Sequence, residues 1–531
     1  MQQPHTPNAN VYDAFQQRFA SGTTFIQAAN GDALYSYADL HRRSGEYANY
    51  LTAQGLCPGD RVIVQVEKSA ECLFVYFACL RAGLIYLPLN TAYQPEEIEY
   101  FVGNAEPSLV ICSPAAETGY RQLLQNSDCR LATLDADGVG SLSQDLDSGH
   151  YAATFSSPPT PPDATAVILY TSGTTGQPKG AMVSHANLLA NTSTLHQTWD
   201  WQPGDVLLHS LPIFHIHGLF VATHLAVYNA SPIILLAGFD AAQVISLLPA
   251  ATVYMGVPTH YVRLLKHGGL TKTVCRNMRL FTSGSAPLLP QTFDAFEAAT
   301  GQRIVERYGM TETGMNTSNP VHGERKPGTV GPALPGVTAR IVDDQGQAVP
   351  PGTAGELQVR GANVFKGYWR MAAKTQEEFT ADGFFKTGDL AEEDADGYIA
   401  IVGRSKDMII SGGLNVYPKE LEALLDKLPG VAESAIIGVA DSDFGEAVTA
   451  VIVAVAGADL DEARVIQYMK QHLANFKIAK SVHFVEALPR NTMGKVQKNL
   501  LREQYGRAAI GRAAIGRAAG SRAADEVTKK V

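Results

Sequence analysis

The chain has few cysteines, and none is placed as a disulfide framework or a zinc site would require. Its six cysteines lie far apart in 531 residues, without a Cys-x-x-Cys spacing: Cys57, Cys72, Cys79, Cys112, Cys129 and Cys275. Closely spaced cysteines are the usual signature of both kinds of site. The cysteines therefore predict buried thiols in a reducing compartment.

Long apolar runs and a leader-like beginning are also missing. No stretch is long enough to cross a bilayer as a helix, and the initial MQQPHTPNANVYDAF has no basic segment followed by an apolar one. The final Lys-Lys-Val is not a peroxisomal tripeptide. We expect no membrane partner and a cytoplasmic location of the bacterial type.

There is no excess of positive charge. The chain has 42 Lys and Arg against 52 Asp and Glu, a net charge of −10. Nucleic acids and anionic membranes attract proteins through basic surfaces, so neither is expected as a partner. A globular chain of 531 residues is too long for one ordinary core, which predicts a large domain and at least one smaller one.

Strand-like and helix-like segments alternate along most of the chain. A βαβ pattern covers residues 61–88, and further strand-like segments occur at 206–211, 231–236 and 280–283. Between residues 328 and 403, short strands separated by Gly and Asp-Gly turns predict a β-rich layer. The fold class is therefore α/β, with this β-rich layer added to the sheets of a large N-terminal domain.

The last part of the ordered pattern predicts a separate small α+β domain. Strand-like segments at 435–439 and 448–455 accompany helix-like segments at 418–428 and 461–474. About a hundred residues suffice for an independent domain. We expect a large domain over 1–403, a small domain over 404–504 and a low-complexity tail over 505–531.

The tail repeats GRAAI from Gly506 and Gly511, followed by GRAAG from Gly516. A five-residue period turns about 500° along a helix, so Ile510 and Ile515 would not share a face. Glycine at every fifth position also disfavours a helix. These features predict a frayed extension, with a partner-binding arm as the alternative.

The most informative segment is YTSGTTGQPKG, from Tyr170 to Gly180. An apolar strand is expected before it at 164–169, and a helix after it at 185–199. A strand, a loop of small and hydroxyl residues and then a helix form the layout of a phosphate cradle, to which Lys179 adds positive charge. It is not a Walker loop, because Pro178 stands where that motif needs its second glycine. A surface turn is the alternative for this segment taken alone.

Four further motifs follow in order: YGMTET from Tyr308, TGDL from Thr387, GRSKDMIISGGLNVYPKELE from Gly403 and PRNTMGK from Pro489. Together with the cradle they resemble the acyl-adenylating superfamily, which holds acyl-CoA synthetases, adenylation domains of peptide synthetases and beetle luciferases. The resemblance covers residues 10–504. It implies an ATP-dependent enzyme that activates a carboxylic acid as its adenylate and transfers it to the thiol of coenzyme A.

The resemblance also implies an ATP site. Joining a carboxylate to the α-phosphate brings two anions together, so cations and N–H donors are needed where charge accumulates. The residues implied to bind phosphates are Thr171, Ser172, Gly173, Thr174, Thr175, Gly176 and Lys179. Those implied around the adenine and the acyl carboxylate are Ser285, Ala286, Pro287, Tyr308, Gly309, Met310 and Thr311.

The remaining implied roles belong to single residues. Asp389 would accept the ribose hydroxyls with help from Arg404, and Glu312 would bind Mg²⁺, for which one carboxylate with phosphate oxygens and waters suffices. Lys495 is implied as the lysine that neutralises the acyl carboxylate and the α-phosphate during adenylation. Lys495, Glu312 and Thr171 are therefore the candidate catalytic residues.

In this superfamily the small domain rotates between the two half-reactions. Lys406 matches the hinge position, and Gly412 and Gly413 match the pair that borders the pantetheine tunnel. Acetylation of Lys495 would remove the charge that its role requires, so a lysine acetyltransferase is a candidate partner.

Two arginines indicate which acid is activated. Arg263 in VPTHYVRLL and Arg307 before Tyr308 lie in segments that build the acyl pocket in this superfamily. An unpaired buried arginine is costly, whereas a second substrate carboxylate would pair with it. Arg263, Arg307 and Ser285 together resemble malonyl-CoA synthetases, which accept malonate and often methylmalonate. The alternative is that either arginine faces solvent or makes a structural contact.

His215 in LPIFHIHG matches the aromatic position beside the acyl pocket. On a strand, His215 and His217 would share a face, which leaves a metal pair as an alternative, although no third ligand stands nearby.

Three further functions stay open. The enzyme could activate another short-chain or aromatic acid, or load a carrier protein supplied by another chain. A catalytically silent nucleotide-binding protein is the third, and the presence of Glu312, Asp389, Lys406 and Lys495 argues against it.

Overall fold

The structure is a computed structural model that describes residues 8–28, 30–171, 178–411, 414–441, 445–473, 475–491 and 494–506. The chain separates into two compact units. The first contains residues 1–340, 358–386 and 397–399, and the second contains 341–357, 387–396 and 400–531. The predicted boundary between 403 and 404 lies close to the start of the last of these segments, and the domain limits stay a prediction.

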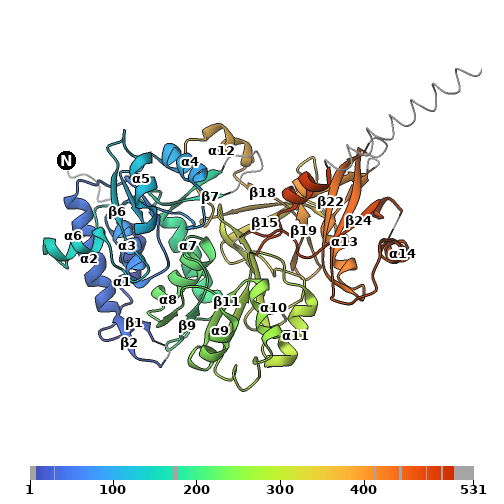
Figure 1. Cartoon of the computed structure of the whole chain (residues 1–531), viewed down its shortest axis with the longest axis horizontal. Coiled ribbons are helices and arrows are strands. Elements are labelled where there is room, and N and C mark those ends of the chain that lie inside the picture. Colours follow the sequence, from blue (N-terminus) through green and yellow to red (C-terminus); the bar gives the residue numbers. More distant parts are fainter. Residues whose placement is uncertain are drawn as a thin grey trace, which may run out of the picture. The chain divides into compact units, whose positions relative to one another are not determined.

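The first unit contains a seven-stranded sheet, of which the strands before residue 185 are shown in blue to green in Figure 1. Its strands, in spatial order, are β17 (Gly367–Tyr368), β8 (Lys179–Ser184), β7 (Thr165–Thr171), β4 (Ile85–Pro88), β3 (Arg61–Gln65), β5 (Leu109–Cys112) and β6 (Arg130–Thr133). Strands β7 to β6 run parallel, and their near-continuous apolar sequences suit a sheet covered on both faces. Helices α4 and α5 cover one face, where Phe101 and Tyr120 pack against Ile63 and Val110.

The same unit contains an eight-stranded sheet. Its strands, in spatial order, are β14 (Gly314–Ser318), β13 (Ile304–Met310), β12 (Leu280–Ser283), β11 (Val253–Gly256), β9 (Leu207–His209), β10 (Ile233–Leu235), β1 (Thr24–Gln27) and β2 (Ala33–Ser36). The strands between the two edges are parallel, and helices α9, α10 and α11 lie together on one face (Figure 1). Tyr261 and Phe296, from two of these helices, stack edge to face at 5.2 Å between ring centroids.

Two smaller sheets follow along the chain. A four-stranded sheet has the order β15 (Val337–Val342), β16 (Gly355–Gly361), β18 (Phe385–Glu393) and β19 (Ile399–Arg404), which is the β-rich layer expected from the sequence. In the second unit, β21 (Leu414–Val416), β20 (Ile409–Ser411), β23 (Gly445–Ala454) and β22 (Val431–Asp441) form a sheet in which β24 (Ser481–Val485) also pairs with β23. The predicted α/β fold class is confirmed.

The described helices connect these strands, and several begin at a residue whose side chain caps the first turn, as Ser36 and Ser69 do. The α-helices are α1 (Val11–Gln16), α2 (Tyr37–Ala53), α3 (Ala70–Arg81), α4 (Pro95–Ala105), α5 (Glu117–Leu123), α6 (Ser141–Gly149), α7 (His185–Thr198), α8 (His224–Tyr228), α9 (Ala241–Leu247), α10 (Pro258–His267), α11 (Pro290–Thr300), α12 (Ala372–Glu378), α13 (Pro418–Leu425) and α14 (Glu462–His472). The shorter helices are η1 (Pro114–Ala116), η2 (His217–Thr223), η3 (Leu248–Ala250), η4 (Ser405–Asp407) and η5 (Asn475–Lys477).

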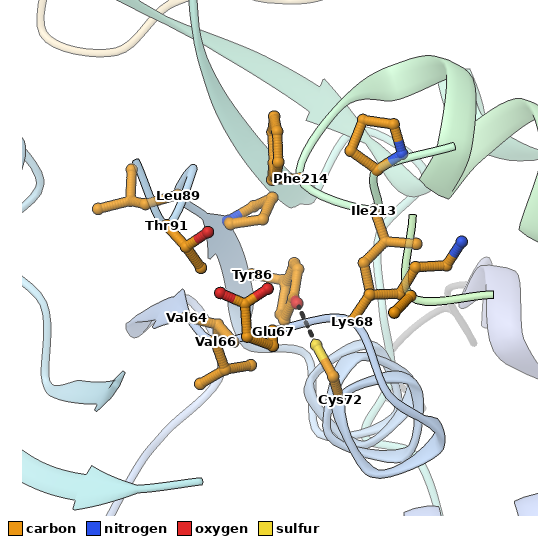
Figure 2. Close-up of a pocket in the computed structure, with 13 residues that line it drawn as sticks. Val64, Val66, Glu67, Lys68, Cys72, Tyr86, Leu89, Thr91, Ile213 and Phe214 are labelled. Carbon is orange, nitrogen blue, oxygen red and sulfur yellow. Dashed lines mark hydrogen bonds between the residues drawn. The ribbon is translucent and has the colours of Figure 1, made fainter. Parts of the chain in front are cut away.

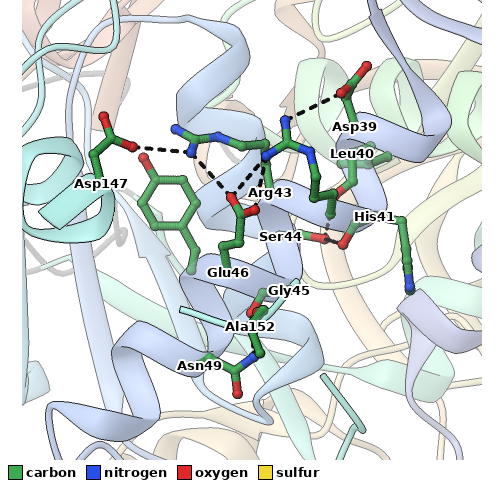
Figure 3. Close-up of polar contacts among 12 residues, drawn as sticks. Asp39, Leu40, His41, Arg43, Ser44, Gly45, Glu46, Asn49, Asp147 and Ala152 are labelled. Carbon is green, nitrogen blue, oxygen red and sulfur yellow. Dashed lines mark hydrogen bonds and ion pairs between the residues drawn. The ribbon is translucent and has the colours of Figure 1, made fainter. Parts of the chain in front are cut away.

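Polar contacts of α2 hold the segment that leads into β7 (Figure 3). Arg43 pairs with Glu46 of the same helix at 3.3 Å and with Asp147 of α6 at 3.6 Å. Asn49 donates to the backbone carbonyl oxygens of Ala152 and Thr154, at 2.8 and 2.9 Å. The chain is therefore anchored before it enters the strand that carries the predicted cradle.

Among the described residues, we find no helix that combines the length and the apolar character needed to cross a membrane.

Candidate active site

The predicted phosphate cradle joins two antiparallel strands. Strand β7 ends at Thr171, β8 begins at Lys179, and the two are paired from Thr171↔Lys179 to Thr165↔Ser184. The helix expected at 185–199 occurs as α7, but it does not follow the loop directly, since β8 lies between the two. The helix N-terminus is therefore separated in sequence from the predicted cradle by the six residues of β8. Ser172, Gly173, Thr174, Thr175 and Gly176 lie outside the described residues.

Glu312, the predicted Mg²⁺ ligand, lies beside this hairpin in the first unit. It is buried in the turn between β13 and β14. Its Oε1 accepts a hydrogen bond from the Tyr368 hydroxyl at 3.0 Å and a longer one from Thr171 Oγ1 at 3.4 Å. The backbone N–H of Phe365 donates to the Glu312 carbonyl oxygen at 2.7 Å. The structure thus brings together two candidate catalytic residues that are far apart in sequence.

Tyr368 and Glu378 belong to this site, and the sequence analysis missed both. The Lys179 ammonium lies 4.4 Å from the centre of the Tyr368 ring and 3.4 Å from Glu378 Oε1. A buried lysine needs such partners, because an unpaired charge is costly away from water. The GYW sequence after β16 was the available signal, but a tyrosine in an apolar strand is usually read as core.

The residues predicted to build the acyl pocket lie at or near the carboxyl ends of β9, β11, β12 and β13. Strand β10 lies on one side of β9 and β11 on the other, so the strand order reverses between β9 and β11. Ligands in open α/β sheets bind outside the carboxyl ends of strands at such a reversal. Ser285 directly follows β12, and His215 and His217 follow β9.

Arg307 on β13 is buried at this edge, with 3% of its surface exposed. Desolvation lowers the pKa of Arg307 to about 9, which leaves the guanidinium a cation at neutral pH. Among the described residues, neither its Nε nor its Nη2 has a hydrogen-bond partner. The guanidinium fits there because Gly284 has no side chain: a Cβ on Gly284 would lie 2.4 Å from Arg307 Cζ. The arginine is held as a buried cation that needs an anion.

Arg263 is placed differently. It lies on α10 with its side chain exposed, close enough to His260 to help lower the pKa of that imidazole to about 3, although burial is the larger cause. The structure therefore leaves Arg263 in solvent while it buries Arg307. Its predicted contact with the substrate stays a prediction.

The other predicted residues of the first unit line the same strand ends. Ser285 is partly buried and has a left-handed backbone, with φ of 69°. Ala286 is partly buried and Pro287 is exposed. The remaining members, all partly buried, are Tyr308, Gly309 and Met310 at the end of β13 and Thr311 in the turn after it.

His217 does not lie on a strand with His215. It is the first residue of the π-helix η2, and His215 precedes that helix. The backbone N–H of His217 donates to Nδ1 of His215 at 3.2 Å, an arrangement unlike a shared strand face. No group of three His, Cys, Asp or Glu side chains that could hold a metal occurs in the described part of the chain.

The second unit groups four of the predicted residues. Asp389 is buried on β18 and its Oδ1 pairs with Arg404 Nε at 2.8 Å. Lys495 is exposed as a residue, yet desolvation of its ammonium, with a smaller contribution from the neighbouring Arg404 cation, lowers its pKa to about 8. Lys406, in the 3₁₀ helix η4, has its pKa lowered by desolvation and by Arg404. Gly412 and Gly413 lie outside the described residues, as does the tail beyond Gly506.

A separate pocket in the first unit lies between the ends of β3 and β4 and the segment after β9 (Figure 2). Tyr86, Leu89, Ile213 and Phe214 contribute to its lining, and none of the residues predicted from the sequence does. The buried ammonium of Lys68 donates to the carbonyl oxygens of His209 and Leu211, each at 2.8 Å. Lys68 therefore ties the first sheet to the segment that leads to His217.

Comparison with known proteins assigns the chain to a family. The description of AMP-binding enzymes matches residues 13–369, and that of the AMP-binding enzyme C-terminal domain matches residues 420–495. ATP-bound MatB from Rhodopseudomonas palustris is 51% identical, with a TM-score of 0.91 over 94% of this chain and 99% of that one.

Other relatives are less similar in sequence to this chain than MatB is. A malonate–CoA ligase from Arabidopsis thaliana is 34% identical over 481 residues, which cover 85% of this chain and 78% of the relative. A feruloyl-CoA synthase from an Amycolatopsis species is also 34% identical, over 90% of this chain and 95% of the relative. These matches confirm the resemblance of the motifs: the chain belongs to the AMP-binding enzymes and is an acid–thiol ligase of the AMP-forming CoA ligase type.

Proposed function

We propose that this ligase is a malonyl-CoA synthetase, which converts malonate, ATP and CoA to malonyl-CoA, AMP and pyrophosphate. The observation that carries the proposal is Arg307, a buried cation with two nitrogens that lack partners among the described residues. A pocket for a long-chain or aromatic acid would gain nothing from such a group, and burying it costs several kcal/mol. The second carboxylate of a diacid would pair with it.

The reaction has two half-reactions. An oxygen of one malonate carboxylate attacks the α-phosphorus of ATP, the bond to the bridging oxygen breaks, and pyrophosphate leaves. Lys179 and the cradle bind the β and γ phosphates, and the Lys495 ammonium offsets the charge that develops on the carboxylate and the α-phosphate. In the second half-reaction, the sulfur of CoA attacks the acyl carbon and AMP leaves.

The remaining roles follow the superfamily pattern. Asp389, with Arg404, binds the ribose hydroxyls; Lys406 is the hinge, and Gly412 and Gly413 border the pantetheine tunnel. Mg²⁺, when bound at Glu312, neutralises phosphate charge. The oxygen atoms of partly buried Thr171 and buried Glu312 suit a small hard cation, and the Tyr368 hydroxyl orients the carboxylate.

Two alternatives belong to the same chemistry. Because a feruloyl-CoA synthase is among the relatives, an aromatic acid is one alternative substrate. In the second alternative, a carrier protein replaces CoA as the acceptor. The relatives give no support for an acetyltransferase that acts on Lys495, which stays outside the proposed function.

The test is a panel of acids in an assay of pyrophosphate exchange into ATP. We expect malonate to be used best, followed by methylmalonate, with acetate, oxalate and coumarate far behind. Consumption of free thiol in the presence of CoA separates a CoA ligase from a carrier loader. If the enzyme turned over acetate or coumarate faster than both malonate and methylmalonate, the proposed substrate would be disproved.

Tyr368→Phe removes a hydrogen bond to the predicted Mg²⁺ ligand without changing the ring that covers Lys179. Losing one hydrogen bond of about 1 kcal/mol should raise the Mg²⁺ concentration needed for half-maximal adenylation roughly fivefold. Titration of Mg²⁺ at saturating ATP measures this change. Tyr100→Phe, which loses a hydrogen bond to the Pro178 carbonyl oxygen instead, is the matched control. If both variants needed the same Mg²⁺ concentration, Tyr368 would have no role in binding the metal.

The pH dependence of adenylation should follow Lys495. Its pKa is lowered to about 8, so the ammonium is charged below that pH and neutral above it. Because the neutral amine cannot offset anionic charge, kcat/KM for adenylation should fall about fivefold between pH 8 and pH 9 and roughly a further tenfold by pH 10. Thioester formation from supplied malonyl-adenylate, measured over the same range, is the control. Parallel decline of both half-reactions would assign the pH effect to another group.

A further inference from the structure

His217 occupies a position that the family motifs do not explain. It is fully buried at the start of η2, and its Nδ1 lies 3.4 Å from Ser285 Oγ. Within the described residues, its other ring nitrogen, Nε2, has no hydrogen-bond partner. A buried polar atom without a partner costs free energy, and in native proteins such atoms are rare enough to need an explanation.

The unpartnered atom of His217 lies in the same neighbourhood as the unpartnered atoms of Arg307. Of the charged groups that act on His217, Arg307 has the largest effect, and its guanidinium sits against Gly284, the residue before Ser285. Among the described residues, three buried nitrogens beside this segment therefore lack hydrogen-bond partners: Nε2 of His217 and Nε and Nη2 of Arg307. A single group with several acceptor oxygens would satisfy all three.

The charges around His217 indicate which kind of group this is. Arg307 acts most strongly on its imidazole, followed by His215, His260 and His209. Burial lowers the pKa values of His260 and His209, so these two rings are neutral at pH 7, whereas Arg307 is a cation. Burial is the main cause that lowers the pKa of His217 far below its usual range, so the ring is neutral and carries one N–H. When the Ser285 hydroxyl donates to Nδ1, that proton is on Nε2.

We propose that His217 is a specificity-determining residue that donates a hydrogen bond from Nε2 to the distal carboxylate of the substrate, beside the Arg307 guanidinium. This inference rests on the proposed function, because it requires a diacid in the site. It adds a neutral donor to the cation: Arg307 provides charge, and His217 fixes the orientation of the carboxylate.

The local backbone is built to hold His217 in place. Gly218 approaches the Pro212 carbonyl oxygen so closely that a Cβ would lie 2.0 Å from it, so the π-helix packs against the preceding turn only with glycine there. Thr223 Oγ1 donates to the Gly218 carbonyl oxygen at 2.9 Å and contacts His209 Nε2 at 3.1 Å. Lys68 in turn donates a hydrogen bond to the carbonyl oxygen of His209 at 2.8 Å. Single π-turns inside helices occur often at functional sites.

Two replacements of His217 separate a substrate contact from a structural one. His217→Gln carries an amide N–H near the position of Nε2, whereas His217→Asn reaches only the position of Nδ1, next to Ser285. We compare kcat/KM for malonate and for monomethyl malonate, in which an ester replaces the distal carboxylate. Calorimetric binding of malonate gives a second readout that does not depend on turnover.

Losing a hydrogen bond to a charged group should lower the preference for malonate over its monomethyl ester about tenfold or more in His217→Asn. His217→Gln should stay within about threefold of the unchanged enzyme, and malonate affinity should follow the same order. Equal preference in all three proteins, or an equal loss in both variants, would overturn the assignment of Nε2.

Folding and the proposed function are checked independently. Thermal unfolding and ATP affinity should be unchanged in His217→Asn, because among the described residues the hydrogen bonds of His217 are made with His215 and Ser285 and not with the cradle. If the unchanged enzyme itself fails to prefer malonate over the monomethyl ester, the proposed function is wrong. If it prefers malonate and His217→Asn keeps that preference, only the role of His217 is wrong.

Discussion

Lys495→Ala should abolish adenylation of malonate while leaving thioester formation from supplied malonyl-adenylate close to normal. In the first half-reaction two anions combine, and the side chain removed is the cation expected to offset their charge. Loss of one such electrostatic group typically costs a factor of about 10² to 10³ in rate. In the second half-reaction a neutral carbonyl is attacked and the α-phosphate already carries the acyl group, so that cation is no longer needed. Pyrophosphate exchange and single-turnover thioester formation measure the two steps separately.

Lys498→Ala is the matched control for this experiment. Lys498 pairs with Glu422 at 2.6 Å within the second unit, and it belongs to none of the motifs. Its removal should lower thermal stability, because it leaves a largely buried carboxylate unpaired, and should spare adenylation in the folded enzyme. If Lys495→Ala slowed both half-reactions equally, the two steps would not have separate residues, and the assignment of Lys495 would fail.

Local sequence patterns correctly predicted those elements in which the pattern of apolar residues alone is enough to specify a strand or a helix. The βαβ pattern predicted over residues 61–88 occurs as β3, α3 and β4, and β12 has the limits expected for it, because these elements are largely buried and flanked by turn or cap residues. Strand β8 was missed for the opposite reason. Its six residues, KGAMVS, follow the cradle without a turn signal, and their strand conformation depends on pairing with β7 and β17.

The π-helix η2 was beyond any local rule. Its sequence, HGLFVAT, reads as a buried helix or a buried strand, and the widened turn depends on the closeness of Gly218 to the Pro212 carbonyl oxygen. This is a contact that appears only in the folded chain. The sequence therefore named both histidines of LPIFHIHG but assigned the functional position to His215 and treated His217 only as half of a metal pair.

For the two arginines as well, the sequence indicated which residues are candidates but not where the fold places their side chains. Sequence motifs identified Arg263 and Arg307 as candidates, but the exposed fraction of each side chain depends on tertiary packing. Arg307 lies on β13 against Gly284, whereas Arg263 lies on the outer side of α10 next to exposed Val262. Tyr368 and Glu378 were missed because their partners, Glu312 and Lys179, are distant in sequence.

Arg307→Met should reduce kcat/KM for malonate by a factor of one hundred or more and at the same time raise thermal stability. Methionine fills a similar volume without charge, and replacing a buried ionic group by a packed apolar one is often stabilising by about 1 to 4 kcal/mol. The effect on malonate binding has the opposite sign. In the variant, the distal carboxylate would be desolvated beside an apolar side chain, and losing a buried charge partner costs about 2 to 5 kcal/mol. Steady-state kinetics and calorimetric unfolding without substrate measure the two effects.

Arg263→Met is the matched control, because that side chain is exposed and its removal should leave thermal stability within about 0.5 kcal/mol. ATP affinity should be unchanged in both variants. Gly284→Ala offers an independent route to the same result, since the added methyl group would displace the guanidinium while leaving Arg307 in the chain. A protein that is destabilised by Arg307→Met and still prefers malonate would show that this arginine supports the scaffold. If Arg307 instead recognises the diacid at a cost in folding stability, Arg307→Met must raise thermal stability while it lowers kcat/KM for malonate.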